Sequence, residues 1–169
     1  PPLREIRHAG TIDVAYAYYK FEEPDSAITA LDRFIKLHPR HPAVDYAYYL
    51  KGLVNFERGG TILDVIVTRD LSEFDRSLLL RAYNDFKLLT QRFPSSEYAT
   101  DARKRMIFLR NELARSDFKI ANYYASREAW VAVTGRTRFI LLNYEGTDVI
   151  KRTLELQLKA YQKLGLEQL

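Results

Sequence analysis

Apolar residues recur at intervals of three and four along most of the chain, which is the spacing of one face of an α-helix. The clearest case is SAITALDRFIKLH (26–38), whose apolar face consists of Ala27, Ile28, Leu31, Phe34 and Ile35. Pro39 and Pro42 follow, and they end the helix because proline lacks an N–H and restricts the residue before it. Asp25, directly after Pro24, is the predicted N-cap residue.

The same helical spacing returns along the rest of the chain. In the stretch RSLLLRAYNDFKLLTQRFP (76–94), the residues that fall on one helical face are Leu79, Ala82, Tyr83, Phe86, Leu89 and Phe93. Ser95 and Ser96 then cap a predicted helix over 97–126, and further helices are predicted over 128–144 and 147–165. Only TILDVIVT (61–68) is β-branched enough to depart from the pattern. The chain is therefore predicted to be all-α.

A helix pair that ends in proline is typical of a helical repeat, and we compared the chain with the 34-residue tetratricopeptide pattern. That pattern has small residues where paired helices cross, an aromatic residue in the first helix and proline after the second. One match is formed by Ala15, Tyr18, Ala27, Leu31 and Pro39. A second is formed by Gly52, Ala82, Phe86 and Pro94. A third is formed by Ala121, Tyr124, Val133 and Ile140, with Glu145 in place of proline.

The second match requires an insertion. Gly52 and Ala82 are 82 − 52 = 30 residues apart, whereas Ala15 and Ala27 are 27 − 15 = 12 apart. We therefore predict one tetratricopeptide-type solenoid with repeats over about 12–42, 43–95 and 96–146, an insertion at 59–77 and a last helix at 147–165. A plain antiparallel bundle is the alternative fold, but it does not explain the small residues at the predicted helix crossings.

Composition narrows the classes of function. The chain has no Cys, and Lys and Arg exceed Asp and Glu by 26 to 22 without any basic block. It contains none of the phosphate-binding, dinucleotide-binding, zinc-protease or serine-hydrolase motifs. We therefore expect no enzyme activity, no metal or other cofactor and no nucleic-acid partner. No run of residues approaches the ~18 apolar residues of a membrane span. The chain starts at Pro1 without Met, which indicates a piece of a longer protein.

The three histidines do not form a convincing metal site. His38 and His41 flank two prolines, so they lack the helical i,i+4 spacing that lets two imidazoles share an ion, and His8 is far away in sequence. We interpret the segment 38–42 as the boundary between two repeats.

Tyrosines cluster in two similar stretches, AYAYYKF (15–21) and DYAYYLKG (45–52). We expect Tyr18 and Tyr48 to pack in the core. Tyr19, Tyr46 and Tyr49 are candidates for exposure on the concave face, where a tyrosine can anchor a peptide with a large ring and a hydroxyl.

Several longer stretches resemble one known family. AYAYYK, LDRFIKLHPRHPAVDYAYYLKGL, DFKLLTQRFPSSEYATDARKRMIFLRNELA and ANYYASREAWVAV are similar to the BamD family (also called ComL or YfiO) of tetratricopeptide lipoproteins in the outer-membrane β-barrel assembly machinery. The likeness runs from about Val14 to Gln162. The family's signal peptide, lipidated Cys and first repeat are missing, so the resemblance assigns neither the membrane anchor nor the N-terminal substrate pocket to residues of this sequence. PPLREIRHAGTID also fits the family poorly.

The resemblance implies a scaffold on the periplasmic face of the outer membrane, held there by a lipid anchor in the full-length protein. Its C-terminal repeats would bind the last periplasmic POTRA domain of BamA. The implied contact residues are Arg136 first, and then Tyr123, Arg127 and Trp130. The last helix would face BamE, BamC would cover the N-terminal half, and the substrates would be unfolded outer-membrane proteins.

Two other classes of function stay open at the level of sequence. An unrelated tetratricopeptide adaptor would need Lys, Arg and Asn in its groove to clamp a carboxylate, whereas the first helices here present mostly Tyr and Ala. An RNA-binding helical repeat would bind oligonucleotides with a steep dependence on salt.

Overall fold

A computed structural model describes residues 3–58 and 76–166, with only the backbone for 3–9 and 11. These residues form helices and no strand, which confirms the all-α prediction. The run 61–68 and most of the predicted insertion lie outside the described residues. The helices are α1 (Leu3–Lys20), α2 (Pro24–Leu37), α3 (Val44–Arg58), α5 (Arg76–Arg92), α6 (Ala99–Ser126), α7 (Trp130–Asn143) and α8 (Ile150–Lys163).

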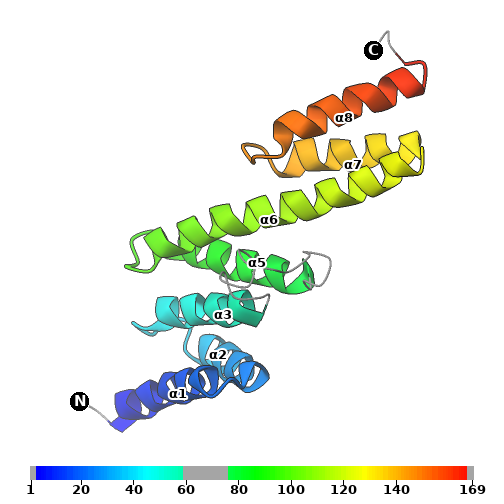
Figure 1. The fold of residues 1–169 in the computed structure, drawn as a ribbon. Coiled ribbons are helices and arrows are strands. Elements are labelled where there is room, and N and C mark those ends of the chain that lie inside the picture. Colours follow the sequence, from blue (N-terminus) through cyan, green and yellow to red (C-terminus); the bar gives the residue numbers. More distant parts are fainter. Residues whose placement is uncertain (1–2, 59–75, 167–169) are drawn as a thin grey trace. The chain divides into compact units, whose positions relative to one another are not determined.

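The chain divides into two compact units, residues 1–109 and residues 110–169, with the boundary inside α6. In unit 1, α1 packs against α2, α2 against α3, and α3 against α5 (Figure 1). In unit 2, α7 packs against α8. Within each unit these helices therefore pack against their neighbours along the chain, as in a helical repeat.

Small residues mark the places where the helices of unit 1 approach closely. Ala15 on α1 and Ala27 on α2 are both completely buried. On α3, a Cβ added to Gly52 would lie 2.6 Å from Cε1 of Phe86 on α5. The absence of a side chain at Gly52 therefore lets α3 and α5 approach each other closely.

The turns between helix pairs use one backbone pattern three times. A residue after each second helix donates its N–H to a carbonyl four residues earlier; the donors are His38, Phe93 and Tyr144. Three residues later, a second N–H bonds back to that donor residue's carbonyl; these donors are His41, Ser96 and Thr147. The three turns coincide with the boundaries that Pro39, Pro94 and Glu145 predict.

His41 makes a side-chain bond within the first of these turns. Its Nδ1 accepts the N–H of Ala43 at 3.1 Å, just as Oγ of Ser96 accepts the N–H of Tyr98 at 3.2 Å. The two acceptors occupy equivalent positions, because 96 − 41 = 55 is also the separation of Pro39 and Pro94. His41 thus makes with its imidazole the bond to the backbone two residues on that Ser96 makes with its hydroxyl.

The predicted cap at Asp25 is wrong. Helix α2 begins one residue earlier, at Pro24, and its N-cap residue Glu23 makes no side-chain capping bond. Proline is well suited to the first helical position, because its φ is already helical and its missing N–H is not needed there. Asp25 instead lies in the first turn and accepts a hydrogen bond of 2.9 Å from Nη1 of Arg58.

The turns inside two helix pairs also match. Glu22 follows α1 with φ +58°, and Glu128 follows α6 with φ +56°. The next residue bonds back five positions in both turns, from Glu23 to the carbonyl of Tyr18 and from Ala129 to that of Tyr124. The offset is constant, since 128 − 22 = 124 − 18 = 106.

Side-chain packing departs from the predicted faces in two helices. Tyr48 is buried as predicted, but Tyr18 is 36% exposed. On α8, where helical spacing would place apolar residues in the core, Leu154 and Leu158 are 52% and 60% exposed, and Thr153 is buried instead. The hydroxyl of Thr153 bonds to a carbonyl of its own helix, so this polar residue is accommodated in the core.

Candidate partner-binding surfaces

The tyrosines predicted for the concave face lie half-buried in unit 1. The ring of Tyr49 stacks on Tyr98 with centroids 4.9 Å apart, and Tyr46 packs against Tyr98 at 5.3 Å. Tyr19 instead contacts Tyr16, at 6.1 Å. The structure brings Tyr46 and Tyr49 together around a third ring that the sequence did not single out.

The hydroxyls of two of these tyrosines are engaged inside the protein. Tyr19 donates to Glu57, and Tyr49 donates to Asp101 at 2.7 Å. Burial raises the pKa of both tyrosines, and these carboxylates raise it further. Burial alone would raise the pKa of Asp101, but hydrogen bonds from Arg105 and Tyr49 lower it overall. A partner on this surface would therefore contact the rings.

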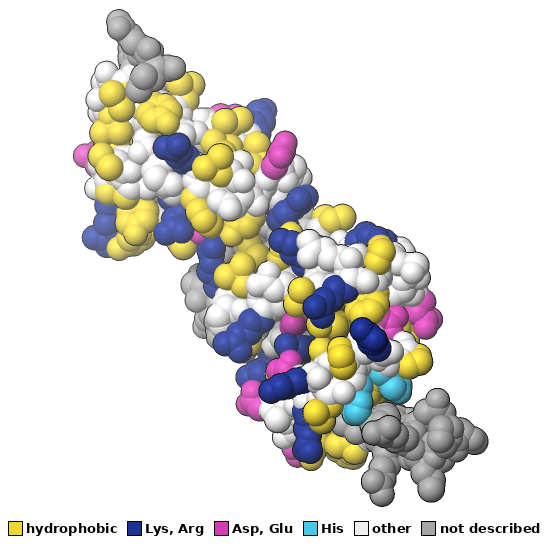
Figure 2. Space-filling view, turned by 180° about the vertical axis from the view of Figure 1, so that it is seen from behind, with side chains coloured by type: hydrophobic (Ala, Val, Ile, Leu, Met, Phe, Trp, Pro, Cys, Tyr) yellow, Lys and Arg dark blue, Asp and Glu magenta, His cyan; other side chains and the backbone are white. Residues whose placement is uncertain are grey.

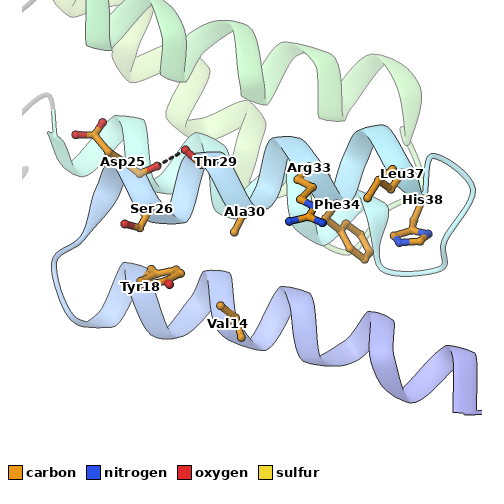
Figure 3. Close-up of a pocket in the computed structure, with 10 residues that line it drawn as sticks. All are labelled: Val14, Tyr18, Asp25, Ser26, Thr29, Ala30, Arg33, Phe34, Leu37 and His38. Carbon is orange, nitrogen blue, oxygen red and sulfur yellow. Dashed lines mark hydrogen bonds between the residues drawn. The ribbon is translucent and has the colours of Figure 1, made fainter.

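A cavity of about 670 Å³ lies between α1 and α2. Figure 3 shows Val14 and Tyr18 pointing from α1 toward α2, where Arg33 and Phe34 line the opposite wall. Tyr18 is exposed because it lines this cavity. The cavity was not predicted, since it depends on how the outer faces of two helices meet.

The predicted site residues of unit 2 belong to three separate interactions. Tyr123 is 54% exposed on α6, and Cζ of Arg127 lies 4.9 Å from its ring centroid. Trp130 begins α7, with Nζ of Lys159 on α8 at 5.8 Å from its ring centroid. Arg136 lies further along α7. The structure thus joins Tyr123 to Arg127 and gives Trp130 and Arg136 other neighbours.

Arg136 is held by a buried carboxylate. Its Nη1 donates to Oδ1 of Asp117 at 2.9 Å, and the Asp117 side chain is 0% exposed whereas that of Arg136 is 32% exposed. Removing the charge of Arg136 is expected to be strongly destabilising, because the charge of Asp117 stays buried. Arg136 therefore has a role within unit 2 that the sequence did not reveal.

A second ion-pair group connects α6 to the turn before α8. Arg115 binds both the buried Glu112 and the exposed Asp148. The N–H of Asp148 also donates to Oδ1 of Asn111 at 3.3 Å. The hydrogen bond to Asp148, which outweighs the effect of burial, raises the pKa of Arg115. These charges stabilise the turn.

Sequence reasoning also missed a pair formed by Phe118 and Arg152. Cζ of Arg152 on α8 lies 5.0 Å from the ring centroid of Phe118 on α6. The two residues are 152 − 118 = 34 positions apart, which is one tetratricopeptide period. This spacing is the one signal in the sequence that points to the pair.

The histidines pack against an aromatic ring. The rings of His38 and His41 lie 5.4 Å and 5.2 Å from Phe34. Among residues 3–58 and 76–166, no cluster of three or more His, Cys, Asp or Glu side chains is arranged to hold a metal ion. Within the same ranges, no helix has the length and apolar character needed to cross a bilayer.

Known proteins with similar sequences carry one common name. The chain is 42% identical over 169 residues to an outer membrane protein assembly factor BamD of Neisseria meningitidis serogroup A, covering 100% of this chain and 63% of that protein. It is 37% identical over 155 residues to the protein of the same name from Vibrio cholerae, covering 92% and 64%. For the Haemophilus influenzae protein of that name, identity is 33% over 155 residues, covering 92% and 59%.

The chain therefore spans less than two thirds of the length of these relatives. A family model described as outer membrane lipoprotein, YfiO, matches residues 2–169, and the chain belongs to that family.

Proposed function

We propose that the chain is a non-catalytic scaffold of the outer-membrane β-barrel assembly machinery, and that unit 2 binds the periplasmic POTRA region of BamA. The observation that carries this proposal is the family match over residues 2–169, together with relatives named as outer membrane protein assembly factors. The protein acts at the periplasmic face of the outer membrane, where a lipid anchor in the full-length protein holds it.

The exposed side chains of unit 2 support a role in protein binding. On the face seen in Figure 2, hydrophobic side chains are interspersed with Lys and Arg over α7 and α8, and carboxylates are few. Tyr123 and Val131 are 54% and 72% exposed. Tyrosine and arginine are among the residue types that dominate binding energy at protein interfaces.

The other proposed partners are each assigned to a different part of the chain. BamE binds at α8, BamC covers the N-terminal half, and unfolded outer-membrane proteins are the substrates. For substrates, the half-buried tyrosine rings around Tyr98 supply apolar area on preformed helices, so binding requires little ordering of the scaffold.

Arg136 is the residue through which the BamA contact is best tested. Arg136→Glu is expected to weaken binding of a periplasmic BamA fragment by about 2 kcal/mol or more. However, the same substitution places a second carboxylate beside the buried Asp117. A loss of binding in this variant could therefore reflect a loss of folding.

A pair of variants separates the two effects. Asp117→Asn keeps the charge of Arg136, and it is expected to bind the BamA fragment as the unmodified chain does. The double variant Asp117→Asn/Arg136→Gln leaves no unpaired buried charge, so it is expected to fold but to bind at least about tenfold more weakly in a calorimetric titration. Unchanged affinity of the double variant would restrict Arg136 to its bond with Asp117.

A further inference from the structure

Two cations of α8 rest on aromatic rings supplied by the preceding helices. Arg152 lies over Phe118 of α6, with Cζ 5.0 Å from the ring centroid. Lys159 lies over Trp130 at the start of α7, with Nζ at 5.8 Å. Both cations are exposed, and neither forms an ion pair with a carboxylate of the described residues. Each ring positions a cation without neutralising it.

The remaining charges of unit 2 leave this surface positive. Residues 110–169 contain 10 Lys and Arg against 7 Asp and Glu, so this unit carries 10 − 7 = +3 of the chain's net charge of +4. Three of its carboxylates, Glu112, Asp117 and Asp148, are already bound by Arg115 and Arg136. One exposed carboxylate, Glu155, lies on the same face of α8 between Arg152 and Lys159, so this face, with Lys163, carries three cations against one acid.

Arginines over rings in unit 1 are bound differently. Arg105 lies 5.1 Å from the ring centroid of Phe56, and it also pairs with Asp101. Arg92 lies over Tyr48 and donates a hydrogen bond of 2.6 Å to its hydroxyl. These arginines have a polar partner as well as a ring, and the α8 cations have only the ring.

The cations of α8 are spaced to match a ligand whose negative charges repeat at regular intervals. Arg152 and Lys159 are seven residues apart, and Lys163 follows four residues later on the same face. Two helical turns separate the first two by roughly 10 Å. A guanidinium that stacks on a ring still has N–H groups at its edge, and these can bind a carboxylate bidentately.

We propose that Arg152 and Lys159, held over Phe118 and Trp130, form a docking site for an acidic protein segment with carboxylates repeating along one face of a helix. Prior fixing of the cations by the rings lowers the entropy lost on binding. This inference rests on the proposed partner-binding role of unit 2, because Trp130 belongs to both sites.

A bilayer surface fits the geometry less well. A membrane-surface helix inserts an apolar face into the bilayer and carries Lys and Arg on its polar face, so a bilayer bound through Arg152 and Lys159 alone would bury no apolar side chain. On α8, the exposed Leu154 and Leu158 point roughly 100° or more away from the edge that carries Arg152 and Lys159, because successive residues of a helix are rotated by about 100°. The rings beneath the cations are half-buried and do not protrude.

Trp130 is the single tryptophan of the chain, so its fluorescence reports directly on this site. The probe is a synthetic helical peptide of about 20 residues, without Trp or Tyr, that carries Glu at alternating spacings of three and four. We expect it to change Trp130 fluorescence saturably, and we expect the matched Gln peptide not to do so. Arg152→Gln/Lys159→Gln is expected to weaken Glu-peptide binding at least tenfold.

The control variant is Arg138→Gln/Lys151→Gln, which removes two exposed cations of the same unit and the same total charge. Its affinity is expected to stay within twofold of the unmodified chain. Equal losses in both double variants, or equal binding of the Gln peptide, would overturn the proposal. So would binding of phosphatidylglycerol vesicles, but not of the Glu peptide, through Arg152 and Lys159. Circular dichroism checks that each variant is folded.

The proposal can fail independently of the BamA contact. If the BamA fragment binds the unmodified chain and the Glu peptide does not, the scaffold role stands and the acidic docking site is wrong. If the peptide binds with the expected variant pattern and the BamA fragment does not, the docking site stands and its partner is another acidic protein.

Discussion

The ring of Phe86 occupies the space where a side chain on Gly52 would begin. An added Cβ would lie 2.6 Å from Cε1 and 2.7 Å from Cδ1 of that ring, and the ring is completely buried. Glycine in a helix costs about 1 kcal/mol relative to alanine, so the close approach of α3 and α5 must outweigh this cost.

Gly52→Ala is therefore expected to destabilise unit 1 by up to about 2 kcal/mol, because overpacking costs about 1–3 kcal/mol and improved helix propensity returns about 1 kcal/mol of it. The matched control is Gly135→Ala on α7, where nothing lies within 4 Å of an added Cβ. That variant should be stabilised by up to about 1 kcal/mol. Urea unfolding followed by circular dichroism measures both; a stabilised Gly52→Ala would show that the ring moves freely.

Glu22 and Glu128, whose backbones adopt the left-handed conformation, provide a second prediction. Glu22→Gly and Glu128→Gly should each raise the free energy of unfolding by about 0.5–1 kcal/mol, because relief of the left-handed strain exceeds the added entropy of the unfolded chain. Glu145→Gly, at a turn residue without positive φ, should lower it. Trp130 fluorescence follows the effect of Glu128→Gly in unit 2. If Glu22→Gly destabilised the protein, the side chain of Glu22 would stabilise the folded state by more than the left-handed backbone conformation costs.

Tyrosine ionisation predicts loss of stability in alkali. Burial raises the pKa of Tyr19, Tyr46 and Tyr49 in the folded chain above the ordinary value of 10.0. The folded state then keeps these protons where the unfolded state loses them. The stabilisation is complete below about pH 10, and it declines as pH rises toward the folded pKa.

The measurement is the urea midpoint at about pH 8 and pH 11, which bracket the ordinary tyrosine pKa. Replacing Tyr19, Tyr46 and Tyr49 by Phe should make the midpoint depend less on pH in this range. The same dependence in the triple variant and in the unmodified chain would assign the alkaline loss to other groups.

The hydrogen bond between Ala43 and His41 predicts a difference between two replacements of His41. His41→Ala removes the acceptor for the N–H of Ala43 and should cost about 1 kcal/mol. His41→Ser should cost less, because Ser96 makes the same bond in the equivalent turn. Thermal unfolding compares the two variants. Equal losses would mean that the contact of His41 with Phe34, which both replacements remove, carries its whole effect.

The predicted C-terminal ends of the helices were correct, because proline ends a helix through its own ring and its missing N–H. Pro39 and Pro94 lie at the turns where α2 and α5 end. Predictions of where helices begin were less accurate. The helix that was predicted to begin at residue 128 begins at Trp130. The reason is that Glu128 adopts the left-handed backbone conformation, and a glutamate in the sequence does not indicate that conformation.

The partner surfaces were predicted only as individual residues. Tyr123 and Arg127 are one helical turn apart, so their contact follows from the sequence once the helix is known. The bond between Arg136 and Asp117 joins two helices, and nothing distinguishes Asp117 locally from other acidic residues. To predict such a pair, one must know which residues of the two helices lie opposite each other. Degenerate repeats of unequal length do not reveal this.

The unequal charge of the two units affects how quickly a partner arrives. A ring contributes no counter-charge, so the field of Arg152 and Lys159 extends into solvent over about one Debye length, roughly 8 Å at physiological ionic strength. An acidic protein is drawn toward unit 2 before any contact forms, and the encounter rate falls as salt is added. The rings under α8 therefore act on the speed of association as well as on the geometry of the bound state.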